Sequence, residues 1–245
     1  MGLYAISDLH LSFLCNKPMD IFGDEWKNHH LKLEEGWRAQ VSGDDTVIIP
    51  GDISWGMRLE EAMDDLEFIH RLPGRKVLSK GNHDYWWNST DKLNGLFKDM
   101  IFLKNSFVWY EDHAICAAKG WICPRDTWSA PTFKPEDEKV FKRERVRLGL
   151  SLSKAKNAGA EKIILMLHYP PCPEIFDDEA GGFAEKPPEE SDFMDIIKEY
   201  PVEKIIYGHI HGALCFEQNM CRTFHGIPAQ LAAADYLEFK PVRIL

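Results

Sequence analysis

The chain has 245 residues, of which 44% are hydrophobic and 12% aromatic, so it has ample material for a large core and is not of the disordered class. Its formal net charge of −10 disfavours long-range attraction to nucleic acid or to an anionic membrane surface. Six scattered cysteines without a Cys-x-x-Cys pair favour reduced thiols. No apolar run approaches the roughly 20 residues of a membrane span, and a cytoplasmic location is expected.

The first hundred residues alternate short apolar runs with helical patterns. Strands are expected where aliphatic and β-branched residues cluster, and helices where apolar residues recur every three or four positions. The predicted order is strand 3–7, helix 26–40, strand 46–49, helix 59–71, strand 75–79 and helix 89–98. This alternation predicts a mainly parallel sheet with right-handed crossovers.

The second half of the chain is richer in short strands. Strands 100–103, 107–111 and 113–117 are expected to be adjacent and antiparallel, followed by helix 136–157, which Gly159 closes. Further elements are predicted at strand 162–167, helix 191–200 and strands 202–207, 213–216, 220–224, 236–239 and 242–245. Residues 170–192 form a long, proline-rich and acidic connection, a candidate lid. The chain contains no interdomain linker, so residues 1–245 are predicted to form one domain.

Five predicted strands run directly into polar residues that a hydrophobic core would not favour. These residues are Asp8, His10, Asp52, Asn82, His83, Asp84, His168, His209 and His211. In open α/β sheets, ligands bind outside the carboxyl ends of the strands, so folding could gather these side chains into one cleft. A mixture of carboxylate, amide and imidazole donors suits Mn²⁺, Fe²⁺ or Zn²⁺, whereas the absence of cysteine disfavours a structural zinc site.

The donors are too many for one tetrahedral ion and sufficient for two ions bridged by a carboxylate. Two metal ions about 3.5–4 Å apart are a recurring arrangement for phosphoryl chemistry, because they bind phosphate oxygens and lower the pKa of a bridging water. The sequence therefore predicts a dinuclear centre.

At these residues the chain resembles the calcineurin-like metallophosphoesterases. The family blocks stand here as Asp8-Leu9-His10, Gly51-Asp52-Ile53-Ser54-Trp55, Gly81-Asn82-His83-Asp84, His168 and Gly208-His209-Ile210-His211, in the family's order. The resemblance implies an α/β fold, a four-layer αββα sandwich of two mixed sheets flanked by helices.

The resemblance also implies a role for each matching residue. Asp8, His10 and His211 would hold one metal ion, and Asn82, His168 and His209 the other, with Asp52 bridging them. The implied ions are Mn²⁺ or iron, with Zn²⁺, Ni²⁺ or Co²⁺ as alternatives. His83 would face the phosphate and protonate the leaving oxygen or stabilise charge.

One position departs from the family pattern. The second aspartate of Gly-Asp-x-x-Asp, which orients the catalytic histidine in the protein-phosphatase branch, is Trp55 here. His83 then needs another partner, for which Asp84 is a candidate, and both residues are predicted as catalytic. The protein-phosphatase branch usually has glutamate at the position of Asp84. The aspartate here favours the nucleotide and phosphodiester branches.

Three further residues are candidates for substrate binding. Arg58 and Arg125 lie near the motif segments, although a surface or structural role is the more common one for such arginines. Trp86 could form an aromatic wall, although packing of the following helix is the commoner role.

The sequence therefore predicts a metal-dependent hydrolase of phosphomonoesters or phosphodiesters, leaning to a small nucleotide-like phosphodiester, that uses metal-activated hydroxide. A metal-binding scaffold on the same fold is the alternative from another class, with Trp55 as the visible loss. A nuclease is a second alternative, which the acidic composition disfavours. A small phosphorylated compound is the expected partner, no membrane is expected, and the oligomeric state is not predicted.

Overall fold

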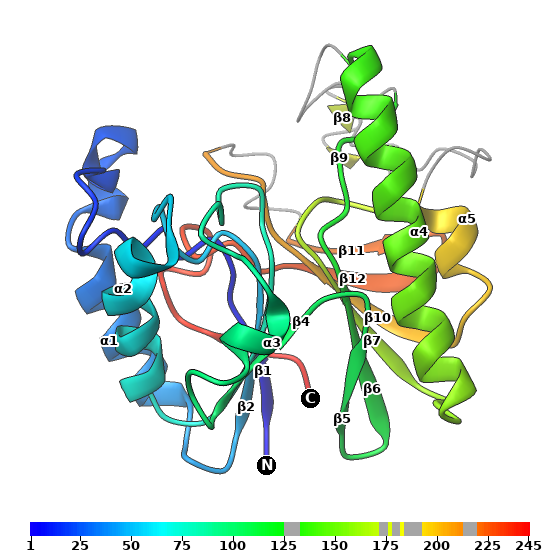
Figure 1. Cartoon of the computed structure of the whole chain (residues 1–245), viewed down its shortest axis with the longest axis horizontal. Helices are drawn as coiled ribbons and strands as arrows, with labels where there is room; N and C mark the ends of the chain where they lie inside the picture. The colour runs from blue at the N-terminus through cyan, green and yellow to red at the C-terminus, as the bar shows by residue number, and fades with distance from the viewer. Residues whose placement is uncertain (125–132, 172–175, 178–181, 184–192, 213–219) are drawn as a thin grey trace. The chain divides into compact units, whose positions relative to one another are not determined.

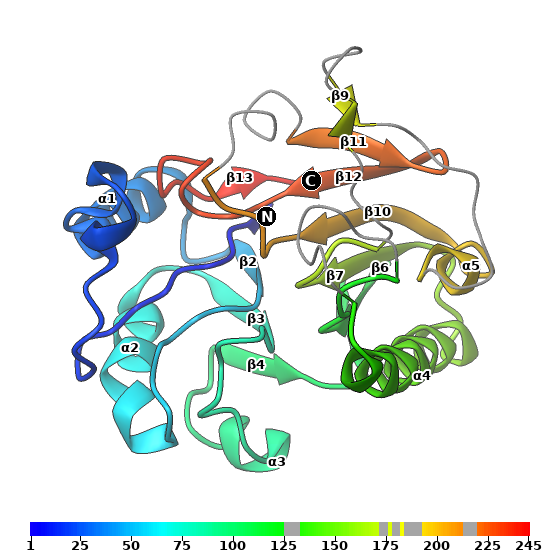
Figure 2. The same cartoon turned by 90° about the horizontal axis from the view of Figure 1, so that it is seen from above.

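The computed structural model describes residues 1–124, 133–171, 176–177, 182–183, 193–212 and 220–245. The described residues form two compact units, the first from residues 1–102 and 232–245 and the second from residues 103–231 with the gaps just given. Each unit carries one mixed sheet and its own helices (Figures 1 and 2). The prediction of an α/β fold with two mixed sheets flanked by helices is therefore confirmed, and a single domain stays a prediction.

The sheet of the first unit positions the first three motif segments. Its strands run in the order β13 (Val242–Arg243), β1 (Leu3–Ala5), β2 (Thr46–Pro50), β3 (Arg75–Ser79) and β4 (Met100–Leu103). β1, β2 and β3 are parallel, as the alternation of strands and helices predicts, and β13 joins β1 in the antiparallel sense. All five residues of β2 are buried, which explains its uninterrupted apolar sequence.

The helices of the first unit differ in part from the prediction. The unit contains η1 (Met19–Phe22), η2 (Asp24–Trp26), α1 (His29–Gln40), α2 (Leu59–Arg71) and α3 (Thr90–Leu93). α2 has the predicted bounds, whereas α1 begins after two short 3₁₀ turns. α3 is a single turn instead of a helix over 89–98, because Asn94 turns its amide to the backbone of Phe102 on β4 and Gly95 follows it.

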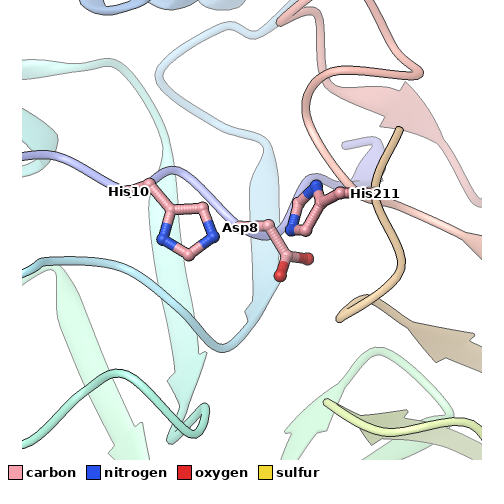
Figure 3. Close-up of side chains that lie close together, drawn as sticks. All are labelled: Asp8, His10 and His211. Carbon is pink, nitrogen blue, oxygen red and sulfur yellow. The ribbon is translucent and has the colours of Figure 1, made fainter. Parts of the chain in front are cut away.

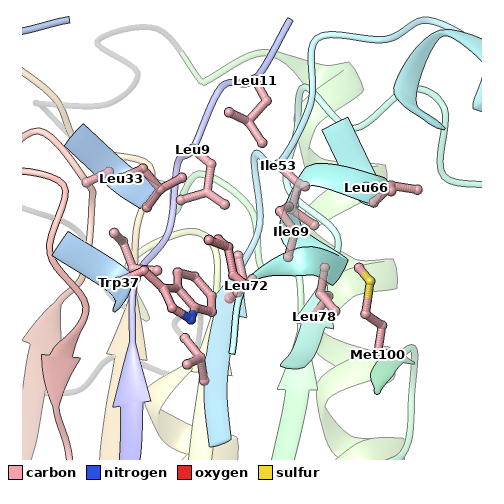
Figure 4. Packing of buried hydrophobic residues seen from close by; sticks show 14 of the residues in the cluster. Leu9, Leu11, Leu33, Trp37, Ile53, Leu66, Ile69, Leu72, Leu78 and Met100 are labelled. Atoms are coloured by element: carbon pink, nitrogen blue, oxygen red, sulfur yellow. The ribbon is translucent and has the colours of Figure 1, made fainter. Parts of the chain in front are cut away.

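The core of the first unit lies between its helices and its sheet. Leu33 and Trp37 of α1 and Leu66 and Ile69 of α2 belong to one buried cluster with Leu78 of β3 (Figure 4). Burying side chains of this size stabilises a fold by about 1.5–3 kcal/mol each. The cluster therefore gives the three motif segments a rigid base.

The second unit is built around a larger sheet. Its strands run in the order β11 (Cys221–Phe224), β12 (Ile227–Leu231), β10 (Val202–Tyr207), β7 (Ile163–Leu167), β6 (His113–Ala118) and β5 (Phe107–Tyr110). The four central strands are parallel and the two edge strands antiparallel. α4 (Pro135–Asn157) and α5 (Met194–Ile197) lie on one face of this sheet (Figures 1 and 2), and β8 (Phe176–Asp177) pairs separately with β9 (Gly182–Phe183).

Several predicted strands need correction. β4 neighbours β3 and not β5, so only β5 and β6 of the three predicted neighbours pair with each other. β12 was not predicted, because Pro228 and Gln230 interrupt its apolar pattern. Residues 236–239 form turns, with a left-handed backbone at Glu238 and Phe239, and are not a strand.

Two predicted features fall largely outside the described residues. The predicted strand 213–216 lies there entirely, and so does most of the candidate lid 170–192. Within the described ranges, no helix combines the length and the apolar character that crossing a membrane would require.

Candidate active site

The first unit brings the first three motif segments to one edge of its sheet. Asp8 and His10 follow β1, Asp52 follows β2, and Asn82 follows β3, so they stand at the carboxyl ends of three neighbouring parallel strands. Asp8 and His10 are two of the three side chains drawn in Figure 3, and the third, His211, belongs to the second unit. The predicted gathering of polar residues at strand ends thus holds within this unit.

Backbone hydrogen bonds join the first two segments directly. The amides of Asp8, His10 and Leu11 donate to the carbonyls of the segment 51–53 at 3.0 Å each. The third segment joins through His83, whose amide donates to Asp52 Oδ1 at 2.8 Å. Because each bond links residues far apart in sequence, the three segments hold one another in register.

The backbone itself is strained at the predicted ligands. Asp8, His10 and Asp52 have φ angles of 58°, 46° and 52°, in the left-handed region that residues other than glycine seldom adopt. In the second unit His209 has a φ of 72°. Such strain persists where the surrounding structure enforces it, and it concentrates at functional sites.

The electrostatics of this cluster favour a cation. Asp8 and Asp52 are 0% and 2% exposed, and their nearest ligand atoms lie within 4.8 Å of each other. His10 offers Nε2 at 3.8 Å from Asp52 Oδ2, and its nearest ligand atom is also within 4.8 Å of that of Asp8. Two buried carboxylates at this separation repel each other unless positive charge lies between them, so this donor set fits a divalent ion.

Gly81 allows the second and third segments to approach each other. A Cβ at this position would lie 2.1 Å from Asp52 Oδ1 and 2.3 Å from the Asp52 amide nitrogen. Any side chain there would displace the carboxylate that the sequence predicts as a metal ligand. The glycine is therefore required by close packing, and not only by the tight turn that the sequence indicates.

The Asp84 carboxylate joins the same loops by hydrogen bonds. Its carboxylate is fully buried and accepts hydrogen bonds from the amides of Asp52, Ile53, Ser54 and Gly81, at 2.8–3.2 Å, and from Trp86 Nε1 at 3.0 Å. Burial and the nearby Asp52 carboxylate raise the pKa of Asp84, and the amide donors oppose that rise. These contacts make Asp84 a positioning residue for the loops, rather than the partner of His83 that the sequence suggested.

Sequence reasoning missed a second buried carboxylate, Asp65 on α2. It accepts hydrogen bonds from Ser54 Oγ and, at 2.9 Å, from the amide of Phe13. Burial raises the pKa of Asp65 to about 6, although these hydrogen bonds oppose the shift. Its signal in the sequence is its place on the apolar side of α2, three residues after Ala62 and four before Ile69.

The second unit carries the remaining predicted ligands. His168 follows β7, and His209 and His211 follow the neighbouring strand β10. The rings of His168 and His209 have centroids 5.2 Å apart, and the buried Tyr169 lies 4.0 Å from His209. His168 is fully buried, so its imidazole is held rigidly at the end of its strand.

The three substrate-binding candidates fare differently. Arg58 is a highly exposed arginine at the start of α2, with Nε 3.8 Å from Glu61 Oε1. Trp86 is 1% exposed and packs against Trp87 and Phe102, which is the packing role and not an open aromatic wall. Arg125 lies outside the described residues.

A comparison with family models identifies the class of protein. The model of the calcineurin-like phosphoesterases matches residues 1–213, and this chain belongs to that family. The matched span contains all five motif blocks, so the resemblance drawn from the sequence is confirmed.

Two individual relatives match shorter parts of the chain. The chain is 38% identical over 78 residues to the Gene 66 protein of Mycobacterium phage L5 and 38% identical over 84 residues to that of phage D29. These matches cover 32% and 34% of this chain and only 37% and 40% of the phage proteins. The crystal structure of phosphopantetheinyl hydrolase (PptH) from Mycobacterium tuberculosis has the same fold, with a TM-score of 0.52 and 15% identity over 100% of this chain and 95% of that one.

Proposed function

We propose that this protein is a dinuclear metal-dependent phosphoesterase that hydrolyses a small phosphorylated compound, with a preference for a nucleotide-like phosphodiester. The observation that carries the proposal is that every ligand position of the five family blocks is filled, inside a chain whose family match spans residues 1–213. The paired buried carboxylates Asp8 and Asp52 support it, because they need a cation to be stable together. Trp55 in place of the family aspartate, and the aspartate at position 84, favour a phosphodiester substrate over a phosphomonoester.

The proposed ligand sets follow the family pattern. Asp8, His10 and His211 are proposed for one ion and Asn82, His168 and His209 for the other, with Asp52 shared. Mn²⁺ or Fe²⁺ suits these mixed oxygen and imidazole donors. When bound, two such ions supply positive charge for the phosphate oxygens and lower the pKa of water to about 7.

His83 is the proposed proton donor. Its side chain is 36% exposed, so a substrate can reach the ring, while its backbone amide ties it to Asp52. An imidazole can give a proton to the leaving oxygen near neutral pH, which typically contributes 10²–10⁴-fold to a rate. The backbone tie keeps the donor close to the proposed metal ligands.

The activity is tested with chelator-treated protein to which single divalent ions are returned. Bis(4-nitrophenyl) phosphate and 4-nitrophenyl phosphate then report diester and monoester hydrolysis, and we expect faster turnover of the diester with Mn²⁺. Asp52→Asn and His168→Ala should abolish turnover, while His70→Gln, an exposed histidine paired with Asp99, should leave it unchanged. Absence of turnover with every ion, or full activity in Asp52→Asn, would contradict the proposal.

The same panel separates the competing functions. A metal-binding scaffold would bind Mn²⁺ yet show no turnover, and His83→Ala would not change its cellular role. A nuclease would cleave single- or double-stranded DNA in preference to small esters, against the chain's net charge of −10. A phosphopantetheine diester joins the substrate panel because of the fold shared with PptH.

A cytoplasmic location is part of the proposal, and cell fractionation tests it.

A further inference from the structure

Trp55 packs against two of the predicted site histidines in the first unit. Its ring stacks on His10, with centroids 4.9 Å apart and planes 23° apart, and lies 4.3 Å from His83 at 52°. The two histidine rings are themselves 5.7 Å apart. One indole therefore touches a predicted metal ligand and the proposed proton donor together.

The position of this indole is set by other residues. Trp55 Nε1 donates to Met19 Sδ at 3.1 Å, and its backbone amide donates to the carbonyl of Leu11 at 2.9 Å. Lys17 Nζ lies 4.3 Å from the ring centroid, a cation–π contact. Because these contacts come from residues 11–19 and not from the histidines, they hold the ring in place independently of His10 and His83.

We propose that Trp55 is a positioning residue that holds the His83 ring in its reactive orientation, in place of the aspartate of the family motif; this inference rests on the proposed function. A carboxylate orients an imidazole through a hydrogen bond to a ring nitrogen, whereas an indole restricts the ring by packing against it, here with the two ring planes 52° apart. The substitution thus changes how the donor is held and does not mark a decayed site.

The first test uses the metal-free protein and needs no activity. In ¹H NMR spectra the ring protons of His83, assigned by their loss in His83→Ala, should be shifted by the ring current of the indole. Trp55→Leu should remove this shift, and Trp55→Phe should keep part of it. Trp109→Leu, which removes a partly exposed tryptophan from β5, should leave them in place. Unchanged His83 signals in Trp55→Leu would overturn the inference.

The second test measures turnover of the aryl phosphodiester with Mn²⁺. Trp55→Leu should lower kcat about tenfold, equivalent to about 1.4 kcal/mol, with KM nearly unchanged. Trp55→Phe should restore most of the rate, and Trp55→Leu should cause no further loss in a His83→Ala background, because both changes then remove one function. Circular dichroism confirms that each variant is folded.

The outcomes of the second test are distinguishable. If His83→Ala lowers kcat but Trp55→Leu adds its full loss on top, Trp55 does not act through His83 and the inference fails alone. If His83→Ala keeps full activity, the proposed proton donor is wrong and the inference fails with it.

Discussion

The carboxyl group of Asp65 should make the stability of this protein depend on pH. It is fully buried on α2, and burial raises its pKa from 3.8 to about 6. Between these values the folded chain keeps a proton that the unfolded chain has released, so the free energy of unfolding falls as the pH rises from about 4 to about 6 and stays lower above it. The difference between the two pKa values corresponds to a loss of about 3 kcal/mol at neutral pH.

Asp65→Asn removes this ionisation and keeps the size of the side chain. The amide oxygen can still accept from the Phe13 backbone, and the amide nitrogen can donate to Ser54 Oγ, which also accepts from the amide of Gly56. Urea unfolding of the chelated wild type and variant at intervals from pH 4.5 to 7.5 measures the effect. We expect the wild type to lose up to about 3 kcal/mol relative to the variant as the pH rises. Parallel curves for the two proteins would refute the reasoning.

Three other substitutions probe the same unit. Asp84→Ala leaves five buried donors without their acceptor, and each unsatisfied donor costs about 1–3 kcal/mol of stability. A large fall in melting temperature is therefore expected in calorimetry, and a fall of less than 3 °C would contradict the role of Asp84 in holding the loops. Gly81→Ala places a Cβ 2.1 Å from Asp52 Oδ1 and should weaken Mn²⁺ binding in titration calorimetry, whereas Gly43→Ala, with no atom within 4 Å, is the control that should not. Lys76→Met removes the buried ammonium that binds Asp99 and the carbonyls of His70 and Leu72, and should lower the free energy of unfolding by about 1–3 kcal/mol without changing Mn²⁺ affinity; an unchanged urea midpoint would show that this ion pair contributes nothing.

The sequence predicted well where the signal is local. Apolar runs that end abruptly in Asp, Asn or His identified β1, β2, β3, β7 and β10 and the polar residues after them. The amphipathic pattern of α2 gave its bounds, because apolar residues at helical spacing face the core. These features depend on neighbouring residues alone, so a single sequence contains them.

The sequence predicted poorly where partners are distant. β4 follows a helical segment and precedes two strands, and nothing local shows that it joins β3 and not β5. Sheet neighbours are chosen by contacts across the fold, and composition does not encode them. The missed strand β12 has the same cause, because its pairing with β10 and β11 outweighs its unfavourable proline.

The support beneath the site is the least predictable part for a related reason. Asp84 binds amides 30–32 residues away, and Asp65 binds the Phe13 amide across 52 residues. In a linear sequence each is one more acidic residue, on a turn or on a helix, and only its burial shows that it fixes a loop. Trp55 is the instructive exception, because a departure from a family motif is visible in the sequence while its replacement contact is not. A changed motif residue is therefore better tested for a substitute contact on the side chain that the missing residue would orient than taken as evidence of lost function.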